Sequence, residues 1–201
     1  SYRPVWRNHT FIRLTPIGFF CYGGLVAMQT LWASPWLMHV SGASAKDAAY
    51  GLFIINLAML GTFWTWGLIN PWLTKKGIDA QRLIAWGSPL ILITALQLVI
   101  SGTQTSVWSW VAFCMSCSVV SVAQPAVGMA FPSHLAGRAL SAYNLVLFLG
   151  VFVVQWGVGL MIDGFKSVGL LEPQAFQAAM AVFLVTCVAS YGYFLKHKSD
   201  S

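Results

Sequence analysis

The sequence predicts an all-α integral membrane protein with six transmembrane helices. Of its 201 residues, 58% are hydrophobic and only 8% are charged, whereas soluble domains are about 25% charged. Six segments contain no Asp, Glu, Lys or Arg. Each meets the roughly 17 to 25 residues that a helix needs to cross about 30 Å of hydrocarbon. Strands of a membrane barrel would instead give alternating segments of about ten residues.

The six spans follow one another as a single transmembrane domain over residues 1–201. Their expected positions are about 17–40, 48–73, 83–100, 107–131, 139–162 and 176–195.

Basic residues gather on one side of these spans and predict the orientation. Nine lie at the ends that share a side with the two termini, and two lie on the opposite side. The nine are Arg3, Arg7, Arg13, Lys75, Lys76, Arg82, Arg138, Lys196 and Lys198, and the two are Lys46 and Lys166. The positive-inside rule then places both termini in the cytoplasm. The net charge of +6 is explained by this topology and by anionic lipid, so nucleic acid is not an expected partner.

Catalytic and cofactor chemistry has little support in the spans. The four histidines lie at or outside span ends, which excludes a haem site held by mid-span histidines on facing helices. Cys114 and Cys117 form a C-x-x-C, so a membrane thiol-disulfide oxidoreductase is one alternative function. No second, loop-borne cysteine pair accompanies them to relay electrons. We expect no enzyme activity, cofactor or metal.

Uncharged polar residues recur at helical spacing in four of the spans. They are Tyr22, Gln29 and Trp36 in the first, Asn56 and Asn70 with Phe63 in the second, Cys114, Cys117, Ser118, Ser121 and Gln124 in the fourth, and Asn144 and Gln155 with Phe148 and Val151 in the fifth. Such residues commonly join helices by hydrogen bonds. They also line water-filled pathways, because polar groups avoid lipid. The set predicts four lining spans and two peripheral spans, the third and the sixth.

A short pattern also recurs between the two halves of the chain. Ala49-Tyr50-x-Leu52 opens the second span and Ala142-Tyr143-x-Leu145 opens the fifth. Two three-helix units in succession face opposite sides of the membrane, as the inverted repeats of transporters do. The pattern therefore favours two inverted three-helix repeats.

Two turns resemble those of the major facilitator superfamily of secondary transporters, in its C-terminal six-helix half. Residues 67–82, GLINPWLTKKGIDAQR, are similar to the family's glycine-rich basic loop, and residues 132–144 resemble its turn between the tenth and eleventh helices. Where the family loop carries an acidic residue, this sequence has Asn70 and Pro71, which leaves Asp79 as a substitute. The resemblance implies a plasma or inner membrane permease. It also implies that this chain, which begins with Ser, is a fragment whose partner is an N-terminal six-helix half.

We therefore expect transport of a small solute by alternating access. The substrate-cavity candidates are Gln29, Trp32, Asn56, Ser118, Ser121 and Gln155. The cytoplasmic gate and loop candidates are Lys75, Lys76, Asp79, Arg82 and Arg138. An oligomeric six-helix channel remains a further alternative.

Overall fold

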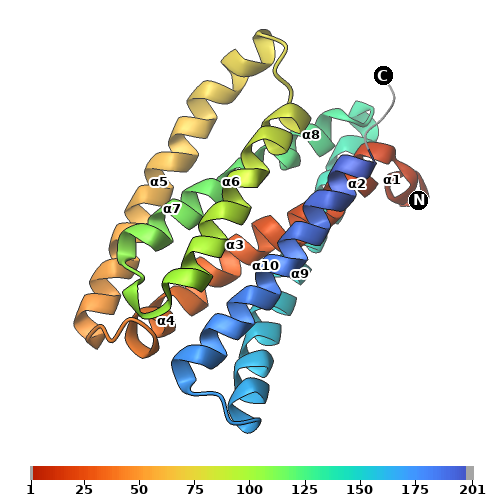
Figure 1. Cartoon of the computed structure of the whole chain (residues 1–201). Coiled ribbons are helices and arrows are strands. Elements are labelled where there is room, and N and C mark those ends of the chain that lie inside the picture. The colour runs from red at the N-terminus through yellow and green to blue at the C-terminus, as the bar shows by residue number, and fades with distance from the viewer. Residues whose placement is uncertain (1, 198–201) are drawn as a thin grey trace.

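The computed structural model describes residues 2–197, which form helices and no strands. Six helices in this part of the chain are long and apolar enough to cross a membrane, and we number them spans 1 to 6 (Figure 1). They run over His9–His39, Ala45–Lys75, Ala80–Gln104, Val107–Met129, Ser133–Ser167 and Glu172–Lys196. The predicted all-helical membrane architecture is confirmed, and the chain is a multi-pass membrane protein.

Span 1 is an interrupted helix. A short helix, α1 (Arg3–Arg7), precedes span 1. The Asn8 side chain caps the start of span 1 by accepting a hydrogen bond from the Phe11 amide. Two π-helical turns break the α-helical winding. The segments are α2 (His9–Ile17), η1 (Gly18–Tyr22), α3 (Gly23–Ala27), η2 (Met28–Trp32) and α4 (Ala33–His39).

Spans 2 and 3 form a helical hairpin. Helix α5 (Ala45–Lys75) starts at the Ser44 cap and continues through Pro71, and helix α6 (Ala80–Ser101) starts at the Asp79 cap. The 3₁₀ turn η3 (Gly102–Gln104) extends span 3. Span 4 consists of α7 (Val107–Cys117), the 3₁₀ segment η4 (Ser118–Val122) and α8 (Ala123–Met129). Span 5 is α9 (Ser133–Ser167), and span 6 is α10 (Glu172–Lys196).

Several helices extend past the charge-free segments that predicted them. Span 1 begins at His9 rather than near residue 17, and span 5 begins at Ser133 rather than near residue 139. A helix satisfies its own backbone hydrogen bonds in the headgroup region as well as in hydrocarbon, so an apolar run marks only the buried part. Consequently the expected turn at 132–144 is mostly the first part of α9.

Spans 1 and 4 are the most buried, and they pack against each other through η1 and η4. Span 1 packs on spans 5 and 6, while span 4 packs on spans 2 and 3. Helices α6 and α10 also pack against each other. The two three-helix units are thus interleaved, and both described ends of the chain lie at one end of the bundle (Figure 1). We call this the terminal end and the opposite one the far end.

Span 1 and α9 meet at backbone distance. A Cβ at Gly150 would lie 2.3 Å from the Phe19 carbonyl oxygen, and a Cβ at Gly23 would lie 2.9 Å from Gly150 backbone carbon. Glycine lets membrane helices approach this closely because it has no side chain.

Candidate functional site

Side-chain hydrogen bonds join span 1 to α5 and to α9 on one side of the bundle. The Gln29 amide nitrogen donates to the Asn56 side-chain oxygen on α5 at 2.9 Å. The Gln155 amide nitrogen on α9 donates to the Thr30 hydroxyl at 3.1 Å. The Trp32 indole N–H adds a 3.2 Å bond to the Gln155 carbonyl oxygen.

Span 4 makes the equivalent bonds to the same two helices. The Gln124 amide nitrogen donates to the Asn144 side-chain oxygen on α9. The Trp66 indole N–H on α5 donates to the Ser118 hydroxyl at 2.9 Å. Spans 2, 1, 5 and 4 are therefore connected in a closed ring of side-chain hydrogen bonds, which we call the polar ring.

Part of the polar ring reaches the surface of the chain deep in the apolar region. Thr30 and Asn56 are exposed, and Gln29 and Gln155 are half-buried. At 1.5 Å per residue, Gln29, Asn56 and Gln155 each lie within about 8 Å of the middle of their helices. These amides are thus not shielded by the six helices of this chain.

The opposite side of the bundle, formed by α6 and α10, has a different surface. The exposed residues between positions 86 and 96 and between 182 and 192 are all apolar. They are Trp86, Pro89, Leu90, Ile93 and Leu96 on α6, and Val182, Val185, Val188, Ala189 and Gly192 on α10. Gln97, the next exposed residue of α6, is polar, and its amide nitrogen donates to the Ser101 and Ser109 hydroxyls. The rest of this surface suits lipid tails, and it belongs to the two helices expected to be peripheral.

The six cavity candidates have different surroundings. Gln29, Asn56 and Gln155 come together around span 1, as described above. Trp32 packs edge-on against Phe176 at 6.0 Å between ring centroids, so its ring fills space between helices.

The two serine candidates lie in span 4, and Ser118 is fully buried. Ser121 is half-buried and makes no side-chain hydrogen bond within residues 2–197. Gln124 and Asn144 belong to the predicted polar stripes but were not among the cavity candidates, and the hydrogen bonds of Thr30 and Trp66 were not predicted.

The loop candidates surround the turn between α5 and α6. The Asp79 carboxylate accepts a 2.8 Å bond from the Arg82 amide and caps α6. Arg82 donates from its guanidinium to the Gly77 carbonyl at 3.2 Å. The Lys76 ammonium lies 4.0 Å from the centre of the Trp72 ring. Lys75 is the exposed last residue of α5.

Arg138 lies apart from this turn. It is exposed in the second turn of α9 and makes no hydrogen bond or ion pair within the described residues. A cation near a helix N-terminus gains nothing from the helix dipole. Nothing in its contacts ties Arg138 to another helix.

Arg13 is a buried charge that sequence analysis assigned to the region before the first span. It lies inside span 1 and is 5% exposed. Its Nε donates to the Phe194 carbonyl at 2.9 Å, Nη1 donates to the Gln81 side-chain oxygen, and the guanidinium lies 4.2 Å over the Phe194 ring. Phe194 is in the last turn of α10, whose carbonyls lack partners within the helix and attract cations. Arg13 thus joins spans 1, 3 and 6 at the terminal end.

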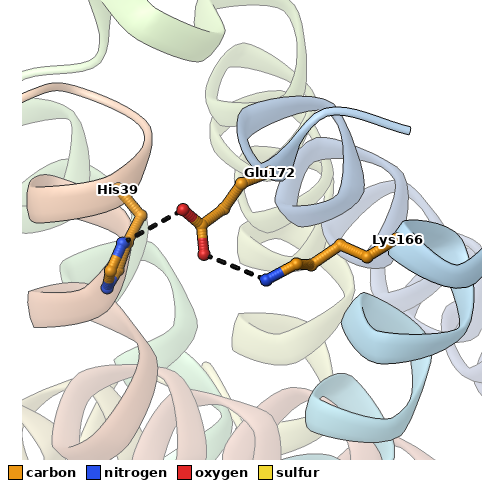
Figure 2. A network of polar contacts seen from close by, with 3 residues as sticks. All are labelled: His39, Lys166 and Glu172. Atoms are coloured by element: carbon orange, nitrogen blue, oxygen red, sulfur yellow. Dashed lines mark hydrogen bonds and ion pairs between the residues drawn. The ribbon is translucent and has the colours of Figure 1, made fainter. Parts of the chain in front are cut away.

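A second charged cluster joins three spans at the far end. Figure 2 shows Glu172, at the start of α10, between His39 from span 1 and Lys166 from α9. Its carboxylate oxygens lie 3.4 Å from His39 Nδ1 and 3.3 Å from Lys166 Nζ. The His39 ring also stacks on Phe176, with 5.9 Å between ring centroids. Span 1 is therefore attached to span 6 at both ends of the bundle.

The cysteine pair considered for redox chemistry is fully buried. Cys114 and Cys117 are both free thiols with no exposed surface. Reactive cysteines are partly exposed in electropositive surroundings, whereas buried ones are usually inert. Their placement gives no access to a thiol substrate.

The chain matches no family model and no curated protein.

Proposed function

We propose that this chain is one half of a secondary transporter that moves a small solute by alternating access. The observation that carries this proposal is the exposed part of the polar ring, formed by Gln29, Thr30, Asn56 and Gln155. Polar groups at this depth face a protein partner or a water-filled pathway, since lipid offers them no hydrogen bonds. A second six-helix half across this face would enclose such a pathway.

The arrangement of the polar ring supports two inverted three-helix repeats. One Gln–Asn pair, Gln29 with Asn56, joins the first two spans of its unit in the far half of the bundle. The other pair, Gln124 with Asn144, joins the first two spans of the second unit in the terminal half. An inverted repeat exchanges the two halves of the membrane in this way.

The interruptions of span 1 supply places where the helix can bend. Its two π-helical turns, at Gly18–Tyr22 and Met28–Trp32, are of a kind frequently found at functional sites. The second turn contains Gln29 and Thr30. Movement of span 1 would thus change the geometry of the residues proposed to meet the solute.

The resemblance of residues 67–82 and 132–144 to segments of the major facilitator superfamily supports a partner that is an N-terminal six-helix half. In this arrangement the protein lies in the plasma or inner membrane with both termini in the cytoplasm. This half contributes amides and hydroxyls to the site, so it binds the solute through hydrogen bonds.

The test is transport by the complete protein in proteoliposomes, using exchange of labelled small solutes across the membrane. Once a solute is found, Asn56→Leu should lower its rate about fivefold to tenfold, since a lost hydrogen bond costs about 1 to 1.5 kcal/mol. Leu57→Ala, at the next position, which is also exposed, is the matched control. Unsaturable flux without exchange would indicate a channel, and equal rates for both variants would remove Asn56 from the site.

A further inference from the structure

A groove lies between α5 and span 4, and its lining includes Trp66 and Ser118, the pair that joins these two spans in the polar ring. Its volume is about 570 Å³, and it is lined by Gly61, Thr65 and Ile69 of α5 and by Met115 and Ser118 of span 4. This volume falls within the range of about 300 to 1,000 Å³ typical of ligand sites. Thr65 is about 180° around the helix from Asn56 at 3.6 residues per turn. The groove therefore opens on a different side of α5 from Asn56.

The walls of this groove offer few hydrogen bonds to a ligand. The hydroxyl of Thr62 donates to the Ala58 carbonyl at 2.8 Å, and that of Thr65 donates to the Gly61 carbonyl at 2.8 Å. The Ser118 hydroxyl donates to the Met115 carbonyl at 2.6 Å. It also accepts the Trp66 indole N–H. With these groups satisfied, the groove presents a mainly apolar surface at the depth of lipid tails.

Three cations follow directly at the terminal end of the groove. Leu73 forms its last wall, and the exposed Lys75, Lys76 and Arg82 surround the turn that comes next. The nearby Asp79 carboxylate is engaged by the Arg82 backbone amide at the start of α6. An apolar groove leading to a basic turn is complementary to a molecule with an apolar chain and an anionic head.

We propose that this groove binds an anionic phospholipid, with one acyl chain along α5 and the phosphate at the basic turn. The chain would contact Gly61, Ile69 and Met115, and the phosphate would meet Lys75, Lys76 and Arg82. The exposed Trp72 ring, beside the Lys76 ammonium, suits the interface between headgroups and tails. This site requires only that the chain span a membrane, so it does not depend on the proposed transport function.

The test is native mass spectrometry of the full chain in detergent, titrated with dioleoyl phosphatidylglycerol or dioleoyl phosphatidylcholine. Phosphatidylglycerol should bind at least about tenfold more tightly, since each nearby cation contributes about 1 kcal/mol, or roughly fivefold. The triple variant Lys75→Gln, Lys76→Gln and Arg82→Gln should bind both lipids equally. A control with Arg138→Gln, far along the chain from the groove, should retain the preference.

A second variant fills the groove without disturbing the fold. A Cβ at Gly61 meets no atom within 4 Å, and the same is true of Gly192 on α10. Gly61→Leu should weaken phosphatidylglycerol binding at least about fivefold, because it displaces several methylenes worth about 0.8 kcal/mol each. Gly192→Leu, a matched change on a different lipid-facing helix, should leave binding intact.

Three results would overturn this proposal. One is equal binding of the two lipids by the unmodified chain, and another is equal binding by the Gly61→Leu and Gly192→Leu variants. The third is full competition by soluble glycerol phosphate, which would mean that the basic turn binds the headgroup and the groove binds nothing. None of these results bears on transport, so the two proposals fail or succeed separately.

Discussion

The two sides of this bundle differ in where they keep their polar groups. On the side of α5, span 1 and α9, amides are hydrogen-bonded to one another yet remain at the surface, as with Gln29 and Asn56. On the side of α6 and α10, the exposed mid-span residues are apolar except Gln97, whose amide nitrogen donates to the Ser101 and Ser109 hydroxyls. The charged Arg13, which joins α6 and α10 to span 1, is buried. The side of α6 and α10 is mainly apolar, whereas the other side carries several amides and hydroxyls at its surface.

This difference shows what mean hydropathy alone conceals. Both sides are formed by helices apolar enough to span a membrane, so composition marks them alike. The position of a few amides around each helix distinguishes the two sides.

The largest expected effect comes from the tight packing beneath the polar side. Gly150→Ala places a methyl group against the Phe19 carbonyl, and it should lower stability by about 3 kcal/mol, at the upper end for overpacking. Gly157→Ala, on the same helix with no atom within 4 Å, should be neutral or slightly stabilising. Reversible unfolding in mixed micelles measures both. Equal stabilities would mean that span 1 and α9 do not pack as described.

A smaller loss is expected when the buried charge of the apolar side is removed. Arg13→Met leaves the Phe194 carbonyl and the Gln81 side chain without their donor. It should cost about 2 kcal/mol, the usual penalty for unsatisfied buried groups. The same change at the exposed Arg138 should cost less than about 0.5 kcal/mol, as for other surface positions. A harmless Arg13→Met would show that the junction of spans 1, 3 and 6 does not depend on this residue.

The smallest effect tests the polar surface itself. Asn56→Leu removes the bond to Gln29 and should cost about 0.6 kcal/mol, the average for such bonds in membranes. A double-mutant cycle with Gln29→Leu isolates that term, using unfolding of the complete protein. If this face instead met lipid, the exposed leucine would stabilise the protein, and the sign of the change would reverse.

The sequence was sufficient to predict the helical class and the order of the six spans, because hydrophobic length is a local property. The division into four lining spans and two peripheral spans, the third and the sixth, stays a prediction. The ends of the helices were predicted less accurately. Pro71 and the residues after Pro132 resemble breaks, yet the helix includes Pro71 and starts at Ser133.

Long-range contacts explain what sequence analysis missed. In the sequence, Arg13 is one of three basic residues before the first apolar run. Its contact with Phe194 at the end of α10 becomes evident only in the fold. The repeated Ala-Tyr-x-Leu pattern was misleading about residue roles. Tyr50 is 65% exposed, whereas Tyr143 is buried and donates its hydroxyl to the Leu14 carbonyl at 3.1 Å. The proposed inverted repeat is supported instead by the two Gln–Asn pairs, Gln29 with Asn56 and Gln124 with Asn144.

The most direct test of the central claim is whether water reaches the polar side at mid-membrane. Single cysteines at Asn56, Leu57 and Ile93 would be exposed to a small membrane-impermeant thiol reagent in the complete protein, with the buried native cysteines as background. Only a thiolate in contact with water reacts readily. We expect Asn56→Cys to react at least about tenfold faster than Leu57→Cys and Ile93→Cys. Equally slow reaction at all three positions would contradict the claim that this side lines a solute pathway.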